Sequence, residues 1–279
     1  MFFSGIADEA GDDIKTQIRA QQELGWHHIE LRNIDGVGVA DLCDRAFESV
    51  VEELAQGGIG VSCFASQLCN WSRPIIKHPD IDRHELARAI PRMQRLGCSF
   101  IRTMSYPNAG WPEEEWKQEV IVRLKVLAGM AEDGGITLVH ENCNGWGGLG
   151  PAQSRELLES VDSPALKFVY DTGNPLGHEQ DPWEYYAGVK DWVVYVHIKD
   201  GRREGGKSVY TFPGEGDGRV HDVVKDLLDS GYDGGFSIEP HLAAIVHQGK
   251  AASESRDSYG LYLEYGRRLM KLVDRIKAG

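Results

Sequence analysis

The sequence predicts an α/β protein folded as a single (β/α)8 TIM barrel over residues 1–279. Short β-rich apolar runs alternate with longer stretches of helical periodicity along the whole chain. Glycines stand between most of the helical stretches and the next apolar run, where helices commonly end. Strands separated by helices lie parallel, and eight such units close a barrel of typically about 250 residues in one domain.

The eight apolar runs are the expected strands, and the helical stretches between them are the expected outer helices. We expect strands at residues 2–7, 28–31, 60–66, 100–104, 136–141, 166–170, 192–198 and 236–239. We expect helices around residues 14–24, 47–54, 90–96, 120–127, 157–161 and 223–228, and a final one over 259–276. The glycines that follow helices are Gly25, Gly58, Gly97, Gly134 with Gly135, and Gly231. An open doubly wound sheet is the alternative, but the first turn lacks the glycine-rich nucleotide fingerprint.

The composition excludes several classes of partner. With 30 basic and 43 acidic side chains the chain carries a formal net charge of −13, so it repels nucleic acid and anionic membranes. No apolar run approaches the ~20 residues that cross a bilayer, and the start turns acidic too early for a signal peptide. The five cysteines contain no C-x-x-C pair, which indicates reduced thiols. We therefore expect a cytoplasmic protein.

Four consecutive expected strands end in a side chain of a type that binds metals. They are Glu141, Asp171, His197 and Glu239. The carboxyl ends of barrel strands meet at one mouth, where active sites are built. Each residue alone has an ordinary structural interpretation, such as a helix N-cap for Asp171. Three convergent carboxylates, however, repel one another by several kcal/mol unless a cation lies between them. Oxygen ligands with one imidazole suit Mn²⁺, Mg²⁺ or Co²⁺, and also Zn²⁺.

These motifs resemble those of the xylose isomerase-like TIM barrels, the sugar phosphate isomerase/epimerase superfamily. The resemblance covers essentially the whole chain. Its segments are Ala7-Asp-Glu-Ala, Ile-Glu30-Leu-Arg32, Glu141-Asn-Cys-Asn, Asp171-Thr-Gly-Asn174, His197-Ile-Lys-Asp200, Pro213-Gly-Glu-Gly-Asp-Gly and Ile-Glu239-Pro. The resemblance implies one divalent ion, with Mn²⁺ expected first, held by Glu141, Asp171, His197 and Glu239. It also implies that the two glutamates form an acid/base pair.

Members of this family act on a carbon next to a carbonyl group. A cation that binds the carbonyl oxygen and a neighbouring hydroxyl stabilises the developing enediolate as a Lewis acid. We expect Glu141 and Glu239 to flank the substrate, one removing a proton and the other returning one on the opposite face. Desolvation on substrate closure would supply the raised pKa values that such carboxylates need. The resemblance therefore implies a metal-dependent isomerase or epimerase of a sugar or keto-sugar.

Other polar residues near the expected mouth are candidates for supporting roles. Glu30 either holds a substrate hydroxyl or pairs with Arg32. Asn174 is a candidate substrate contact, although many relatives have a histidine there. His241 is a candidate acid/base group or a partner of a metal ligand. It ranks above His140, which strand alternation points outward if its neighbour points inward.

A basic loop and several tryptophans complete the candidate site. Lys199 and Arg202 belong to a basic segment that either clamps a phosphate or carboxylate or is simply solvated. The sequence shows no clear phosphate cradle, which favours a non-phosphorylated sugar. Tryptophans in or near loops after the expected strands either stack on sugar C–H surfaces or anchor lids and subunit contacts. They are Trp71, Trp111, Trp146 and Trp183.

Three other functions remain open at this stage. The same proton abstraction can lead to elimination, as in an inosose dehydratase or a lyase of 3-keto-C-glycosides paired with a small partner subunit. A barrel endonuclease would need several zinc ions, an additional histidine at the position of Asn174, and a surface suited to DNA. A non-catalytic sugar-binding barrel would keep the ligands without turnover. The resemblance also implies that the protein can form a homo-oligomer, because members of this family often do.

Overall fold

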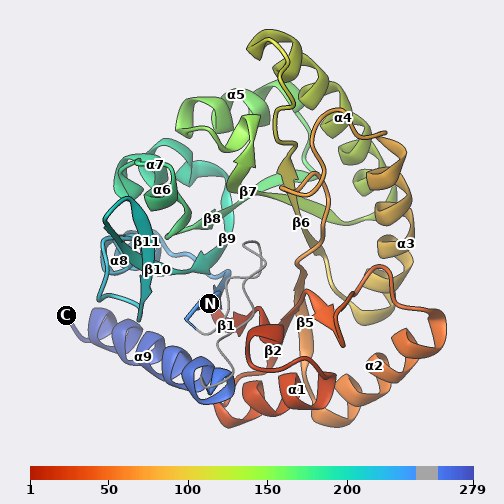
Figure 1. Ribbon diagram of the computed structural model, residues 1–279. Coiled ribbons are helices and arrows are strands. Elements are labelled where there is room, and N and C mark those ends of the chain that lie inside the picture. Colours follow the sequence, from red (N-terminus) through yellow and green to blue (C-terminus); the bar gives the residue numbers. More distant parts are fainter. Residues whose placement is uncertain (243–256) are drawn as a thin grey trace.

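The computed structural model describes residues 1–242 and 257–279, and in these ranges eight parallel strands form one sheet. The strands are β1 (Phe2–Gly5), β2 (His28–Leu31), β5 (Gly60–Phe64), β6 (Phe100–Ser105), β7 (Thr137–Gly145), β8 (Leu166–Asp171), β9 (Val193–Ile198) and β12 (Gly235–Ile238). Their order is β1-β12-β9-β8-β7-β6-β5-β2. A parallel bridge between Ile6 and Glu30 joins the two ends, so the sheet curls into a nearly closed barrel (Figure 1). The predicted fold class and all eight predicted strands are confirmed.

Helices surround the strands as an outer ring (Figure 1). They are α1 (Ile14–Glu23), α2 (Asp44–Gly57), α3 (Asp80–Leu96), α4 (Glu113–Gly134), α5 (Pro151–Val161), α6 (Asn174–Gly177), α7 (Pro182–Val189), α8 (Val220–Asp229) and α9 (Ser258–Ala278). The last helix completes the ring beside the first, where Gln21 Nε2 donates to the Tyr262 hydroxyl at 2.9 Å. Among the described residues, no helix is long and apolar enough to span a membrane. That residues 1–279 form one domain stays a prediction.

Left-handed glycines end three of the longest outer helices. Gly58, Gly97 and Gly135 follow α2, α3 and α4 with φ angles of 66°, 66° and 65°. Residues with a Cβ are strained in this conformation, whereas glycine is not. The prediction that these glycines follow the ends of helices is therefore confirmed.

Two short helices and two hairpins were not predicted. Two short helices, α6 and α7, lie between β8 and β9, where the sequence showed no helical periodicity. A hairpin of β10 (Asp200–Glu204) and β11 (Lys207–Thr211) replaces the loop expected after β9, and a second small hairpin pairs β3 (Asn33–Ile34) with β4 (Val37–Gly38). The β10–β11 hairpin is largely exposed, so burial leaves no apolar pattern in its sequence.

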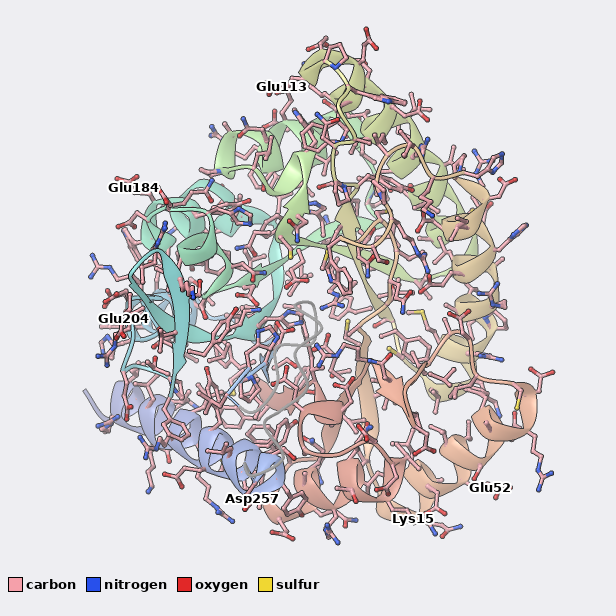
Figure 2. All side chains as sticks on the ribbon, in the orientation of Figure 1. Lys15, Glu52, Glu113, Glu184, Glu204 and Asp257 are labelled. Carbon is pink, nitrogen blue, oxygen red and sulfur yellow. The ribbon has the colours of Figure 1, made fainter. Side chains whose placement is uncertain are left out.

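The barrel interior is filled at its amino-terminal end and polar at its carboxyl-terminal end. Cys63, Val139, Val169 and Tyr195 form a small cluster inside the strands, separate from the larger core between the sheet and the helices. A hydrogen-bonded chain of Ser4, Ser62 and Tyr195 lies inside the barrel. Charged residues face outward around the ring, as shown for Lys15, Glu52, Glu113, Glu184 and Glu204 in Figure 2. The filled amino-terminal half leaves the carboxyl ends of the strands to form the site.

Candidate metal centre and active site

The four predicted metal ligands come together at the carboxyl-terminal mouth of the barrel. Glu141 lies on β7, Asp171 ends β8, His197 lies on β9 and Glu239 directly follows β12. One potential ligand atom from each residue lies within 4.8 Å of those of the others. All four side chains are buried, and none is more than 4% exposed. Neighbouring parallel strands therefore bring together residues that are as many as 98 positions apart in the sequence.

Local hydrogen bonds orient the carboxylates of β7 and β8. The backbone N–H groups of Gly173 and Asn174 both donate to Asp171 Oδ1 at 2.8 Å. The side-chain amide of Asn174 donates to Glu141 Oε1 at 3.0 Å. The guanidinium Nη1 of Arg102, on β6, lies 3.3 Å from Glu141 Oε2. Asn174 thus positions the two ligand residues, since its amide holds one carboxylate and its backbone the other.

Glu239 is held by three cationic or imidazole groups. Its Oε1 lies 3.2 Å from Arg32 Nη1 and 3.2 Å from His241 Nε2. Its Oε2 accepts a hydrogen bond from Lys199 Nζ at 2.7 Å. Arg32 also pairs with Asp8 through Nη2 at 2.9 Å, which anchors the guanidinium from the opposite side.

His197 is fixed by a carboxylate behind it. Its Nε2 lies 3.1 Å and 3.2 Å from the two oxygens of Glu30, and Ser237 Oγ donates to Glu30 Oε2 at 2.6 Å. The other ring nitrogen, Nδ1, faces Glu141 Oε1 at 3.4 Å and Glu239 Oε2 at 4.0 Å. A carboxylate that binds one imidazole nitrogen leaves the other nitrogen free to bind a metal.

The contacts of Glu30 differ from the two that the sequence suggested, which were a substrate hydroxyl and Arg32. Glu30 is fully buried and contacts His197 and Ser237 instead. The sequence could not show this contact, because Glu30 and His197 are 167 residues apart. We assign Glu30 to the orientation of His197.

The charges of the cluster are only partly compensated by the protein. Burial favours the neutral form of Glu141, but Arg102 and His197 outweigh it and lower the pKa of Glu141 to about 2. Burial raises the pKa of Asp171 to about 7, against the opposing effect of the Lys199 ammonium. Burial also disfavours the charged imidazole of His197, but Glu30 and Glu141 outweigh it and raise the pKa of that ring to about 10.

The donor set fits one divalent ion. Glu141 Oε2 and Asp171 Oδ2 are buried carboxylate oxygens, and each faces a single side-chain cation among the described residues: Arg102 Nη1 at 3.3 Å and Lys199 Nζ at 2.8 Å. Buried acceptors of this kind are costly unless a cation or donor satisfies them. Three carboxylates and one imidazole are the ligands expected for Mn²⁺, Mg²⁺, Co²⁺ or Zn²⁺. The Nε2 atom of that imidazole already contacts Glu30, so Nδ1 is the atom that would bind the metal.

Comparison with known proteins places the chain in a family. The profile of the xylose isomerase-like TIM barrel family matches residues 18–260. The chain belongs to this family. A 2-epi-5-epi-valiolone 7-phosphate 2-epimerase of Actinoplanes sp. is 27% identical over 162 residues, which cover 58% of each chain. An inosose dehydratase of Bacillus thuringiensis is 25% identical over 183 residues, covering 59% of this chain and 61% of the relative. The match thus spans about three fifths of these curated relatives.

A solved structure of the same family supports the barrel fold. It is a xylose isomerase-like TIM barrel protein from Mycobacterium smegmatis in complex with magnesium. The structural match has a TM-score of 0.70 at 22% identity and covers 94% of this chain and 88% of the other. At this level of identity the match establishes the shared fold.

A cavity of about 810 Å³, including its open mouth, lies over the cluster of this xylose isomerase-like barrel. Glu141, Glu239, Asn174 and Lys199 line it. Its other polar lining residues supply amides, a hydroxyl, carboxylates, cations and an indole ring, and small or apolar residues complete the wall. The polar ones are Asn33, Gln67, Asn70, Ser66, Asp41, Glu85, Arg32, Arg102 and Trp71. Such a surface is suited to a ligand with many hydroxyl groups.

Three predicted substrate contacts lie elsewhere. Trp146 is 2% exposed and belongs to the core between the sheet and the helices. Trp111 lies just before α4, where its backbone binds the side chain of Asn108. Arg202 is exposed on β10 and donates to the backbone oxygen of Glu215. Since none of the three lines the cavity, we do not propose them as substrate contacts.

His241 lies behind Glu239 rather than in the cavity. Its side chain is fully buried, and Nε2 lies 3.2 Å from Glu239 Oε1 and 3.4 Å from Glu9 Oε1. Burial and the Lys199 ammonium lower the pKa of His241 to about 4. We therefore assign His241 to the positioning of Glu239. His140 is also buried, and it packs against Phe168 on the outer side of the strands, as strand alternation predicts.

Two functional residues were missed by the sequence reasoning. Arg102 is buried on β6 and contacts Glu141, and Glu9 accepts a hydrogen bond from the backbone N–H of His241 at 2.8 Å. Arg102 carried a usable signal, because a charged residue within a short apolar run requires a buried partner. Glu9 carried no such signal, since it follows a strand in a polar turn.

Proposed function

We propose that this protein is a divalent-metal-dependent isomerase or epimerase of keto-sugars that abstracts a proton next to a carbonyl group. The observation that carries the proposal is the position of Glu141 and Glu239. Both belong to the four-residue cluster, and both line the cavity. The epimerase and dehydratase among the relatives support enzymatic chemistry on cyclic polyols and sugars.

The two glutamates are suited to proton transfer. Arg102 and His197 keep Glu141 ionised, while Lys199 and His241, against the effect of burial, hold the pKa of Glu239 well below its usual range. Before substrate binds, both carboxylates are therefore ionised at neutral pH. The raised pKa values expected on closure are absent in this state, so desolvation by the substrate must supply them.

The cluster would hold the metal through Glu141, Asp171, His197 and Glu239. A divalent ion there would act as a Lewis acid that makes the C–H bond next to a carbonyl more acidic. One glutamate then takes the proton onto a carboxylate oxygen. The other, which takes up a proton from solvent when substrate closure raises its pKa, returns that proton to the opposite face of the carbon. We propose Mn²⁺ as the metal, with Mg²⁺, Co²⁺ and Zn²⁺ as alternatives.

The cavity supports a neutral sugar rather than a sugar phosphate. Each of the three cations that line it is paired with a carboxylate: Arg32 with Asp8, Arg102 with Glu141, and Lys199 with Asp171 and Glu239. A phosphate bound by a guanidinium fork would need Arg32 or Arg102 to leave its carboxylate, whereas Lys199 alone offers a single point charge. We therefore propose a non-phosphorylated keto-sugar as the substrate.

A dehydratase or lyase is the second candidate. The similarity to inosose dehydratases favours it, because the one from Bacillus thuringiensis matches the chain over 183 residues and the epimerase over 162. Elimination begins with the same proton abstraction, and it ends in loss of a leaving group instead of return of the proton. The cluster and the cavity accommodate both outcomes.

Incubation with keto-sugars in D₂O tests the proposal. With Mn²⁺ present, we expect deuterium at the carbon next to the carbonyl and no loss of a group. An enone that absorbs in the ultraviolet would instead support the dehydratase. Glu141→Gln and Glu239→Gln should abolish exchange, whereas the exposed control Glu184→Gln should retain it. Near-normal exchange in both site variants would overturn the assignment.

A further inference from the structure

Lys199 is buried at the centre of the candidate site. It lies just beyond β9, two residues after His197, so both side chains point into the barrel mouth. Only 2% of the residue is exposed. The adjoining turn leaves room for it, because a Cβ at Gly173 would lie 2.8 Å from Lys199 Cγ.

The Lys199 ammonium contacts one carboxylate oxygen each of Asp171 and Glu239, in both cases the oxygen that accepts no hydrogen bond from another described residue. Its Nζ lies 2.8 Å from Asp171 Oδ2 and 2.7 Å from Glu239 Oε2. The second oxygen of Asp171 accepts two backbone N–H groups, and the second oxygen of Glu239 faces Arg32 and His241. In the described part of the chain, no other donor hydrogen-bonds Asp171 Oδ2 or Glu239 Oε2. These two oxygens are therefore among those that a metal ion would bind.

We propose that Lys199 is an internal counter-ion which a divalent metal must displace from Asp171 and Glu239. The inference rests on the metal centre of the proposed function, and it adds that the Lys199 ammonium competes with the metal for the same two oxygens. An ammonium group and a divalent ion cannot both lie between the same two oxygens at bonding distance, because their positive charges repel each other. Metal binding thus breaks two buried ion pairs, which weakens the apparent affinity for the metal.

The displacement has two consequences. Without metal, Lys199 compensates two buried carboxylates that would otherwise destabilise the fold. With metal, the ammonium has to move into the cavity that it already lines, where it faces the bound substrate. Metal loading and presentation of Lys199 to the substrate become one coupled event.

Calorimetric titration with MnCl₂ tests the competition without any substrate. Lys199→Met keeps the length of the side chain and removes the charge, so we expect it to bind Mn²⁺ about ten-fold more tightly than the unmodified protein or more. The control Lys190→Met removes a half-exposed lysine that pairs with Asp226 at 3.1 Å, and its affinity should be unchanged. Unchanged or weaker binding by Lys199→Met would overturn the inference while leaving the metal centre intact.

Chemical labelling of the unmodified protein gives a second test that needs no variant to fold. Reductive methylation, followed by peptide mass spectrometry, should label Lys199 slowly in chelator and about ten-fold faster in MnCl₂. Equal rates in the two conditions would contradict displacement. If calorimetry detects no Mn²⁺ binding by the unmodified protein or by Lys199→Met, the proposed metal centre is wrong and this inference is wrong with it. If Mn²⁺ displaces Lys199 but no keto-sugar exchanges deuterium, only the proposed function fails.

Discussion

At the scale of single residues, the contact between Glu30 and His197 is the most informative feature of the site. Glu30 is fully buried beneath the cavity and holds the Nε2 side of the ring. Its contribution should therefore appear in metal binding rather than in substrate recognition. This separates Glu30 from the glutamates that line the cavity.

The first prediction concerns this contact. Glu30→Gln should weaken Mn²⁺ binding by about 10- to 100-fold, because an amide orients the imidazole less strongly and makes it a poorer ligand. Calorimetry with MnCl₂ measures the effect. Glu23→Gln, on the outer face of α1, is the control. Metal affinity equal to that of the control would contradict the role assigned to Glu30.

Trp71 is the aromatic residue that the structure places at the cavity. It lines the cavity and is 41% exposed, in contrast to the buried Trp146. Trp71→Ala should raise the KM for a turned-over keto-sugar about ten-fold with a smaller effect on kcat, since stacking contributes about 1–2 kcal/mol to binding. Trp111→Ala is the matched control because Trp111 does not line the cavity. Equal KM changes in the two variants would remove Trp71 from the substrate site.

The ligand residues were predictable from the sequence, but their supporting contacts were not. Glu141, Asp171, His197 and Glu239 lie in or directly after four neighbouring strands of the sheet, and the geometry of a parallel barrel brings them together. Contacts such as that of Lys199 with Asp171 depend on the rotamer of a long side chain, because the rotamer decides which oxygen the ammonium reaches. Strand periodicity carries no information on rotamers.

At the scale of secondary elements, the carboxylate of Asp200, the first residue of β10, holds the loop between β11 and α8. Asp200 is buried, and each of its oxygens accepts two backbone N–H groups. Oδ1 binds Gly201 and Gly218 at 2.8 Å and 2.9 Å, and Oδ2 binds Gly214 and Gly216 at 2.8 Å and 3.1 Å. A Cβ at Gly216 would lie 2.3 Å from Asp200 Oδ1, so this close approach requires glycine.

Replacement of Asp200 should therefore destabilise the protein. In Asp200→Asn one acceptor oxygen becomes an N–H₂ donor that faces backbone N–H groups, which should cost about 2–3 kcal/mol. Urea unfolding measures the loss. Asp217→Asn in the same loop is exposed and should change the free energy of unfolding by less than about 0.5 kcal/mol. A loss within that small range for Asp200→Asn would show that the loop is held by other contacts.

The elements that the sequence missed are short or exposed. Helix α6 has four residues and α7 has eight, so neither contains enough turns to show a helical period. The long helices were visible because their buried faces repeat over several turns, as in α2, where Phe47, Val50, Val51 and Leu54 are buried. Detection thus depended on the length of the buried face.

At the scale of the whole molecule, the barrel was predictable because its signals agree with one another. Eight apolar runs, the helical stretches between them and the glycines at helix ends all indicate the same repeat. The substrate was not predictable in this way, because the cavity is lined by residues from loops whose positions follow from packing. Gln67, for example, accepts a hydrogen bond from Arg73 through Oε1, and Arg73 is itself paired with Asp82 and Glu85.

The barrel brings together one acidic cluster, one overlying cavity and one internal ammonium group. Three carboxylates lie close together in this buried site, and we propose that a divalent cation completes the cluster. The location of that cation is the central claim, and every proposed role of the surrounding side chains depends on it.

An anomalous difference map at the manganese edge, from crystals grown with MnCl₂, tests this claim most directly. We predict one strong peak bonded to Glu141, Asp171, His197 and Glu239, with Lys199 Nζ moved away from Asp171 and Glu239. A map without a peak among these four residues, or with the strong peak at another place on the protein, would contradict the account.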